Sequence, residues 1–146
     1  MELSLKSEYA ILAMLELANH FALDQPLQIR QIAVQQNIPD RYLEQLLATL
    51  KRQGLVKSQR GAKGGYILAR DPWEISVLEV VRGIEGYDAI AEQNHKSTHT
   101  SASLSVIHEI WEASQKAASN VLDSCTLKDL CDRQRQRQIA TTMYYI

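Results

Sequence analysis

Three polar side chains close together in the sequence have the chemistry needed to hydrogen-bond to the edges of nucleic-acid bases. Glu44 and Gln45 follow Arg41 by three and four residues, so a helix would place all three on one face. Arginine can donate two hydrogen bonds to guanine, glutamine can pair with adenine, and glutamate can accept from cytosine. Glu44 could instead form a salt bridge on the helix surface, so both roles stay open for it.

A basic, glycine-rich segment follows this group. Its sequence is Arg60-Gly61-Ala62-Lys63-Gly64-Gly65, and no acidic residue occurs between Gln45 and Arg70. The same stretch carries six positive charges: Lys51, Arg52, Lys57, Arg60, Lys63 and Arg70. Glycines let a backbone turn tightly and approach a sugar-phosphate surface, and an arginine can enter a narrow minor groove, where the potential is most negative. The segment is typical of a surface that faces phosphates, although a solvated charged face would have the same composition.

Hydrophobic periodicity predicts the helices that would position the base-reading group. Apolar residues at helical spacing predict a first helix from about Ser7 to Phe21 and a second from Leu27 to Asn37. A third helix begins at Asp40, which we expect to be its N-cap, and ends at the C-terminal glycine Gly54. The Ile38-Pro39 turn between the second and third helices makes the pair a candidate helix-turn-helix.

A β-hairpin is predicted directly after the third helix. Leu55–Gln59 and Tyr66–Ala69 alternate like strands, and the glycine-rich basic segment between them has the composition of a turn. A fourth helix, capped by Ser76, then continues to Gly86. The order of these parts predicts a winged helix-turn-helix.

The C-terminal part predicts a loop and two more helices. Asp88 to Ser103 is polar and without periodicity, which indicates a loop. The next residues form the stripe of a helix that packs on another helix: Leu104, Ile107, Trp111, Ser114, Ala118 and Val121. A small domain has little use for so long a seam, so we expect the same helix of a second subunit to cover it. A last helix begins at Thr126. The fold is thus predicted to be mainly α with a small β-hairpin, divided into a DNA-binding domain (1–86), a sensing-type loop (87–103) and a dimerisation and C-terminal helix region (104–146).

Composition and charge narrow the classes of function. The chain has 146 residues, is 45% hydrophobic and carries a formal net charge of -1. Residues 1–70 hold nine Lys or Arg against six Asp or Glu, whereas residues 71–146 hold seven against eleven. The first apolar stretch is too short and too charged to span a membrane, so we expect a soluble, cytoplasmic protein without a membrane partner. We do not expect an enzyme, because phosphate loops, nucleophile elbows and paired metal motifs are absent from the sequence.

Motifs spread over nearly the whole chain resemble the Rrf-type family of bacterial winged-helix transcription regulators. The matching residues are Lys6-x-x-Tyr9-Ala10, Tyr42-Leu43-Glu44-Gln45-Leu46-Leu47, Gly54-Leu55-Val56, Arg60-Gly61-Ala62-Lys63-Gly64-Gly65-Tyr66 and His108-Glu109-Ile110-Trp111. The resemblance implies a homodimer that places the third helix of each subunit in successive major grooves of a palindromic operator and each wing in a minor groove. The residues expected to contact double-stranded DNA are Lys6, Arg41, Tyr42, Glu44, Gln45, Lys51, Arg60, Gly61, Lys63, Gly64 and Gly65. Tyr42 could contact a phosphate or pack in the core, and Lys6 could contact a phosphate or serve only solubility.

This sequence departs from the family where many members hold an iron-sulfur cluster. Those members supply three cysteines before the dimer helix, often with a histidine one turn before the tryptophan. Here the matching positions are Gln93, His99 and Ser105, and only His108 keeps the ligand-like position. We therefore expect no cofactor and, in particular, no cysteine-ligated cluster.

Two other sets of side chains leave a sensing role open. His95, His99 and His108 offer imidazoles, and Glu8 lies in a region from which some members take a carboxylate ligand, a set that would suit zinc or ferrous iron. They could equally be solvated histidines and a glutamate near a helix N-terminus. Cys125 and Cys131 lie six residues apart and would face different ways on one helix, so they could not bond within the chain. The alternatives to simple operator binding are thus a redox- or metal-responsive sensor and a regulator controlled by a partner protein.

Overall fold

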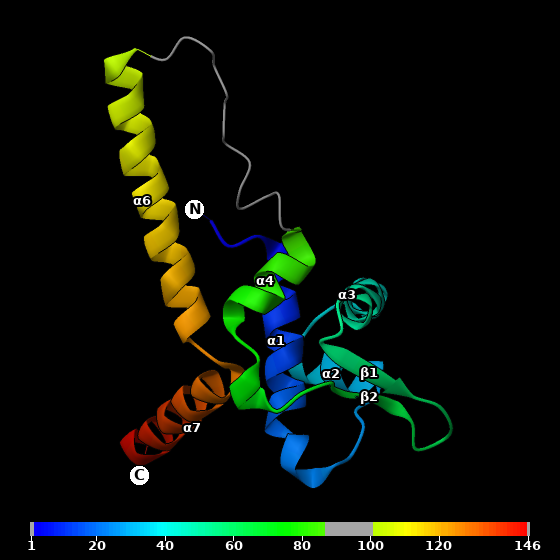
Figure 1. Ribbon diagram of the computed structural model, residues 1–146. Helices are drawn as coiled ribbons and strands as arrows, with labels where there is room; N and C mark the ends of the chain where they lie inside the picture. Colours follow the sequence, from blue (N-terminus) through cyan, green and yellow to red (C-terminus); the bar gives the residue numbers. More distant parts are fainter. Residues whose placement is uncertain (1, 87–100, 146) are drawn as a thin grey trace.

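The predicted mainly α fold with a small β-hairpin is confirmed by a computed structural model, which describes residues 2–86 and 101–145 (Figure 1). Its elements are α1 (Leu5–Asn19), η1 (Phe21–Leu23), α2 (Ile29–Gln36), α3 (Asp40–Arg52), β1 (Val56–Gln59), β2 (Gly65–Leu68), η2 (Pro72–Glu74), α4 (Val77–Glu85), α6 (Ala102–Ser124) and α7 (Leu127–Tyr144). The η elements are short 3-10 helices.

Helix α1 lies at the centre of the core. It packs against α2, α3, α4 and α7, and its side chains Ala10, Ala13 and Met14 are completely buried. Helix α3 is strongly amphipathic, since the leucines at helical spacing, Leu43, Leu46, Leu47 and Leu50, all face this core. Burial of one leucine contributes about 1.5–3 kcal/mol, so this face fixes the rotation of α3 about its axis.

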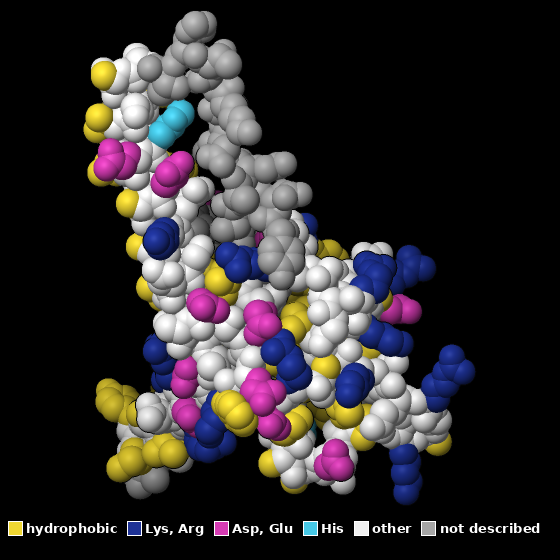
Figure 2. All heavy atoms as spheres, viewed as in Figure 1, with side chains coloured by type: hydrophobic (Ala, Val, Ile, Leu, Met, Phe, Trp, Pro, Cys, Tyr) yellow, Lys and Arg dark blue, Asp and Glu magenta, His cyan; other side chains and the backbone are white. Residues whose placement is uncertain are grey.

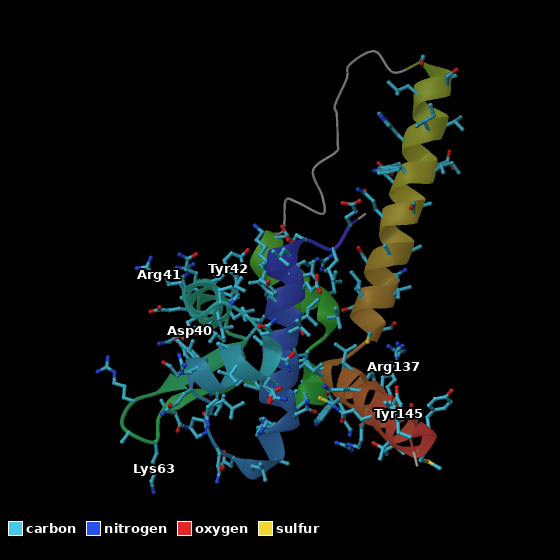
Figure 3. The ribbon with its side chains drawn as sticks, turned by 180° about the vertical axis from the view of Figure 1, so that it is seen from behind. Asp40, Arg41, Tyr42, Lys63, Arg137 and Tyr145 are labelled. Carbon is cyan, nitrogen blue, oxygen red and sulfur yellow. The ribbon has the colours of Figure 1, made fainter. Side chains whose placement is uncertain are left out.

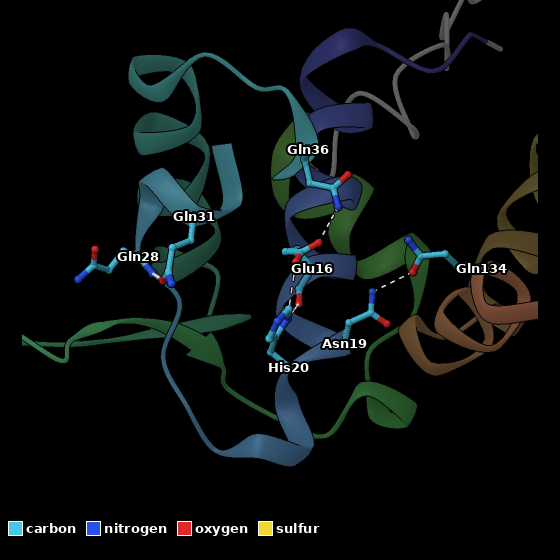
Figure 4. Close-up of polar contacts among 7 residues, drawn as sticks. All are labelled: Glu16, Asn19, His20, Gln28, Gln31, Gln36 and Gln134. Carbon is cyan, nitrogen blue, oxygen red and sulfur yellow. Dashed lines mark hydrogen bonds and ion pairs between the residues drawn. The ribbon is translucent and has the colours of Figure 1, made fainter. Parts of the chain in front are cut away.

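Polar contacts connect α1 to its neighbours on two sides (Figure 4). The Nε2 of Gln36, at the end of α2, donates to Oε2 of the buried Glu16 at 2.7 Å. On the other side, Nδ2 of Asn19 donates to Oε1 of Gln134 in α7 at 2.8 Å. These contacts tie the helix-turn-helix and the C-terminal helix to the same central helix.

The hairpin pairs β1 and β2 in antiparallel register, with Val56 opposite Leu68 and Ser58 opposite Tyr66. Leu27 was expected in the second helix, but it forms a β-bridge with Tyr66 instead. The two residues exchange backbone hydrogen bonds of 3.0 and 2.8 Å. Helix α2 therefore begins only at Ile29, because the backbone of Leu27 is committed to the hairpin.

The first helix begins at Leu5, before the expected Ser7, and one predicted helix cap is wrong. Ser4 caps α1: its hydroxyl accepts from the Ser7 amide at 3.1 Å, while Ser7 itself is buried. Asp40 is the first residue of α3, and Pro39 occupies the N-cap. The Asp40 carboxylate still lies in the first turn of α3, where a negative charge interacts favourably with the helix dipole.

The C-terminal helices differ in how they relate to the core. No residue of α6, across Ala102–Ser124, is buried, whereas Leu127 and Cys131 of α7 belong to the central core. The Val77 amide donates to the Cys125 carbonyl, and the Leu127 amide to the Ile75 carbonyl, which anchors the start of α7 beside α4. The predicted region 104–146 thus shares a core with the predicted domain 1–86. Most of the expected sensing-type loop (87–103) lies outside the described residues, and α6 already begins at Ala102.

Among the residues that the structure describes, no helix is both long and apolar enough to cross a membrane.

Candidate nucleic-acid interface

The predicted base-reading residues lie together on the exposed face of α3. Arg41, Glu44 and Gln45 are all exposed, opposite the buried leucine face. Arg41 points away from the body of the protein, whereas Tyr42 is directed toward α1 (Figure 3). This face can present the two donors of Arg41, the carboxylate acceptor of Glu44 and the amide of Gln45 to the base edges in a major groove.

Tyr42 is half-buried and packs against the central helix. Its ring meets the ring of Tyr9 edge to face, with centroids 5.6 Å apart and planes at 78°. This contact supports the expectation that Tyr42 contributes to packing. The turn before α3 is formed by Asn37, which adopts the left-handed conformation and caps α2, and by the Ile38 amide, which donates to the Ala33 carbonyl. These contacts set the angle between α2 and α3.

The tip of the hairpin presents two cations. Arg60, Gly61 and Lys63 are exposed between the two strands, and the hairpin projects from the body (Figures 1 and 3). Gly61 adopts a φ of +107°, which side-chain-bearing residues rarely do, so the turn requires glycine there. The tip can therefore bring positive charge close to a phosphate backbone.

The other two wing glycines are explained by close backbone contacts inside the protein. A Cβ on Gly64 would lie 2.3 Å from the Gln59 carbonyl oxygen, and one on Gly65 would lie 2.4 Å from the Leu27 carbonyl oxygen. Gly64 is buried and Gly65 is half-buried. Their contribution to this surface is the shape of the hairpin.

The cations of the acid-free stretch differ in their partners. Lys51 donates to the Ser58 hydroxyl at 2.7 Å and Arg52 to the Thr49 hydroxyl at 3.1 Å, and neither contact neutralises the charge. Arg70, in contrast, forms a 2.6 Å ion pair with Glu79. Figure 2 shows Lys and Arg side chains gathered over α3 and the hairpin.

Lys6 lies in an ion pair at the N-terminal end of α1. Its Nζ is 3.6 Å from Oε2 of Glu85, the last residue of α4. Glu85 also accepts hydrogen bonds from the hydroxyls of Ser4 and of the buried Ser7. The Ser4 hydrogen bond, together with Ser7 and Lys6 and opposed by partial burial, holds the pKa of Glu85 below its ordinary value. Lys6 is half-exposed, so it could contact a phosphate only while sharing its charge with Glu85.

Two further cations belong to this surface although sequence reasoning did not assign them to the DNA contacts. Arg52 lies on the exposed face of α3, and Lys57 is exposed on β1. Neither has an ion-pair partner among residues 2–86 and 101–145. Their position in the acid-free stretch was the signal that could have identified them.

Helix α6 carries the residues predicted for dimerisation along an uncovered row. Leu104, Ile107, Trp111 and Val121 are exposed, and Ala118 is half-buried. Hydrophobic side chains follow the outer edge of this helix in Figure 2. The inner side of α6 contacts α4. A soluble single chain would leave this apolar row in water, which is costly.

Only two of the four candidate metal ligands lie in the described part of the chain. His108 is half-buried on α6 and Glu8 is exposed on α1, while His95 and His99 lie outside the described residues. Residues 2–86 and 101–145 contain no group of three or more His, Cys, Asp or Glu side chains that could hold a metal ion.

Both cysteines are free thiols near the junction of α6 and α7. Cys125 follows the end of α6 and is half-buried, and Cys131 is buried against α1. Burial raises the pKa of the Cys131 thiol, which disfavours the thiolate that metals and oxidants require. This thiol is a core side chain in the folded protein.

Helices α2 and α3 with the β1–β2 hairpin define the chain as a winged helix-turn-helix protein, with α3 as the recognition helix and the hairpin as the wing. Residues 3–133 match the Rrf2 family model, which is described as "iron-dependent transcriptional regulator". The chain belongs to the Rrf2 family.

Similar proteins agree with this assignment. The regulator CymR of Bacillus subtilis is 36% identical over 100% of both chains, and IscR of Photorhabdus laumondii is 34% identical over 96% of this chain and 85% of its own. The structure of T. potens IscR matches with a TM-score of 0.78 and 39% identity, covering 94% of this chain and 91% of that one. The structure of CymR, the global cysteine regulator of B. subtilis, gives the same TM-score over 91% of this chain and 98% of its own. These relatives are transcriptional regulators and not enzymes, and this chain is a DNA-binding transcription regulator.

Proposed function

We propose that the regulator acts as a homodimer on a palindromic operator. Each subunit binds one half-site with its recognition helix and its wing. The observation that carries this proposal is the uncovered apolar row of α6, in which Ile107, Trp111 and Val121 are 62%, 52% and 67% exposed. A two-fold axis would place this row against its own copy. The same axis relates the two α3 helices, which requires a two-fold symmetric DNA site.

On each half-site, α3 occupies the major groove and the wing the adjacent minor groove. Arg41, Glu44 and Gln45 face the base edges, and Arg60 and Lys63 follow the backbone. Supporting this arrangement, all five side chains are exposed, and none has an ion-pair partner among the described residues.

Sedimentation of wild type and of two tryptophan variants tests the dimer. Trp111→Glu places a charge in the α6 row and should give a monomer that no longer binds a palindrome. Trp73→Glu is the matched control, because Trp73 of η2 is similarly exposed, at 59%, but lies outside α6. It should leave the dimer intact. A monomeric wild-type protein would contradict the proposal.

Salt dependence separates DNA binding through this surface from a winged helix that only contacts proteins. Neutralisation of phosphates releases counterions, so the observed affinity should fall linearly with the logarithm of salt concentration. With six or more phosphate contacts per dimer, affinity should drop by roughly a thousandfold between 50 and 200 mM salt. A DNA affinity that does not change with salt concentration would contradict binding through this surface.

The residues present do not fit a cysteine-ligated iron-sulfur cluster. The chain has two cysteines, Cys125 and Cys131, and the second is a buried core thiol with a raised pKa. Such clusters require several accessible thiolates. We therefore propose that the isolated protein carries no such cluster. Anaerobic purification followed by visible absorbance and by iron and sulfide analysis tests this proposal. A stoichiometric cluster would contradict it.

The same purification tests the histidine set as a metal sensor. Copurified zinc or iron that is lost in His99→Ala or His108→Ala would identify that set as a sensor.

We further propose that the genes under the control of this regulator respond to cysteine supply. This proposal rests on full-length similarity: the match covers all of B. subtilis CymR, the global cysteine regulator, but 85% of P. laumondii IscR. As a regulator of bacterial genes, the protein acts in the cytoplasm. Transcript profiling of a deletion strain with and without added cysteine tests this point. Unchanged transcripts of sulfur-metabolism genes would contradict it.

A further inference from the structure

The wing is held from two sides at the paired residues Ser58 and Tyr66. On one side, Nζ of Lys51 in α3 donates to the Ser58 hydroxyl in β1 at 2.7 Å. Ser58 pairs with Tyr66 of β2 across the hairpin, and Tyr66 pairs in turn with Leu27, just before α2. A continuous set of contacts therefore runs from the recognition helix through both strands to the start of α2.

A wing of two strands needs such contacts, because an isolated two-stranded hairpin is only marginally stable in water. The Leu27 side fixes β2 through paired backbone hydrogen bonds and the close approach at Gly65. On the α3 side, Lys51 supplies a side-chain contact to β1. Arg60 follows Ser58 by two residues, so a change in the angle of the strand at Ser58 moves Arg60 directly.

We propose that Lys51 is a positioning residue: through Ser58 it sets the angle of the wing relative to the recognition helix, and thereby the spacing between major-groove and minor-groove contacts. This inference rests on the docking of the wing proposed above. It gives Lys51 a role different from the phosphate contact that its charge alone suggests.

Lys57 provides the matched comparison. It is the neighbour of Ser58 on β1, it carries the same charge as Lys51, and its exposed side chain has no hydrogen-bond or ion-pair partner among the described residues. A lysine of this kind can act on DNA only through its charge. Removal of the Ser58 hydroxyl keeps the positive charge of both lysines. It should therefore abolish the positioning role of Lys51 and leave the contribution of Lys57 unchanged.

A double-mutant cycle tests the proposal with Lys51→Met, Ser58→Ala and the combined variant, and with Lys57→Met as control. The measurements are operator affinity across a salt series and hydroxyl-radical protection of the minor groove beside each half-site. Ser58→Ala should lower affinity about three- to tenfold, the loss that corresponds to one hydrogen bond. Its salt slope should stay at the wild-type value while minor-groove protection weakens. In the Lys51→Met background, Ser58→Ala should cause no further loss. Lys51→Arg, which retains a donor, should keep most of the affinity.

Three results would overturn the inference. Ser58→Ala could bind like wild type, the losses from Lys51→Met and Ser58→Ala could be additive, or minor-groove protection could persist in both variants. In the first two cases, a reduced salt slope in Lys51→Met, like that of Lys57→Met, would identify a phosphate contact. Circular dichroism and thermal unfolding establish that each variant is folded at the temperature of the assay. If the wild-type protein gave no minor-groove protection, the proposed docking would fail, which is distinguishable from failure of the Lys51 role alone.

Discussion

At the scale of single residues, the positive charges of the candidate nucleic-acid interface differ in availability. Arg60 and Lys63 stand exposed at the wing tip, whereas Arg70 is paired with Glu79 at 2.6 Å. Lys6 shares its charge with Glu85. Charge counting along the sequence treats these cations as equal, but a cation that already has a carboxylate partner gains less from a phosphate. The unpaired cations should therefore contribute most to binding.

The first prediction concerns Arg60. Arg60→Ala should cost about 1–3 kcal/mol of operator affinity and leave the fold intact, because the side chain is exposed and has no ion-pair partner among the described residues. Fluorescence anisotropy with a labelled operator measures the loss. Arg137→Ala is the control, since it removes the same charge from α7, on the side of the protein opposite Lys63 (Figure 3). Equal affinity losses in both variants would show that net charge, and not the wing, is responsible.

The second prediction concerns Glu85. Because Ser4, Ser7 and Lys6 lower the pKa of this carboxyl in the folded protein, its contribution to stability is complete above the ordinary value of 4.5. That contribution is lost as the pH falls through the lower pKa of the folded state. Glu85→Gln should thus reduce the free energy of unfolding at pH 7 and have a smaller effect at pH 3.

Urea unfolding at the two pH values measures this difference. Glu44→Gln, an exposed carboxyl on α3, should leave the free energy of unfolding unchanged at both pH values. An equal effect of Glu85→Gln at pH 7 and pH 3 would contradict the role given to the Glu85 anion.

Residue positions within one helix could be predicted from the sequence, but contacts between elements could not. The exposed face with Arg41, Glu44 and Gln45 follows from the spacing of the leucines opposite, and the structure confirms that placement. The partner of Lys6 is 79 positions away in the sequence, and no local pattern indicates it. Lys51 likewise meets Ser58 only because the wing folds back beside α3.

At the scale of elements, the wing depends on a glycine that approaches another segment. Gly65→Ala would place a Cβ 2.4 Å from the Leu27 carbonyl oxygen, at a φ of +151° that side chains rarely adopt. Backbone must shift to relieve this clash, so we predict a loss of about 1–3 kcal/mol in the free energy of unfolding. Chemical unfolding followed by circular dichroism provides the measurement.

Gly83→Ala in α4 is the control with the opposite sign. The added Cβ would make an ordinary contact, 3.4 Å from Cγ of Gln53, and alanine favours the helix. This variant should be unchanged or more stable by up to about 1 kcal/mol. Stability of Gly65→Ala equal to wild type would show that the Leu27 contact does not constrain the wing.

The elements themselves were largely predictable, because amphipathic spacing and turn residues are local signals. The exceptions have identifiable causes. Leu27 has the apolar character of a helix residue, yet it pairs with Tyr66 across the hairpin. Asp40 is a common N-cap type, but Pro39 precedes it with an extended backbone and takes the cap position. Both depend on backbone hydrogen bonding that residue type alone does not determine.

At the scale of the whole molecule, the two C-terminal helices have separate roles. Helix α7 returns to α1 and places Leu127 in the core, whereas α6 keeps an exposed apolar row. The sequence predicted the row on α6 from its spacing. It could not show that α7 belongs to the core of the DNA-binding region, since Leu127 and Cys131 are too few to give a periodic pattern. The apolar row of α6 therefore remains available to the second subunit proposed above.

The central claim, a dimer of winged helices on a two-fold symmetric site, is tested most directly by selecting bound sequences from a random DNA pool. The selected sites should contain two inverted half-sites whose centres are one helical turn, about 10 base pairs, or a multiple of it apart. Flanking positions beside each half-site should be biased where the wing enters the minor groove. Selection of no common sequence, or of a single half-site without a symmetric copy, would contradict the account.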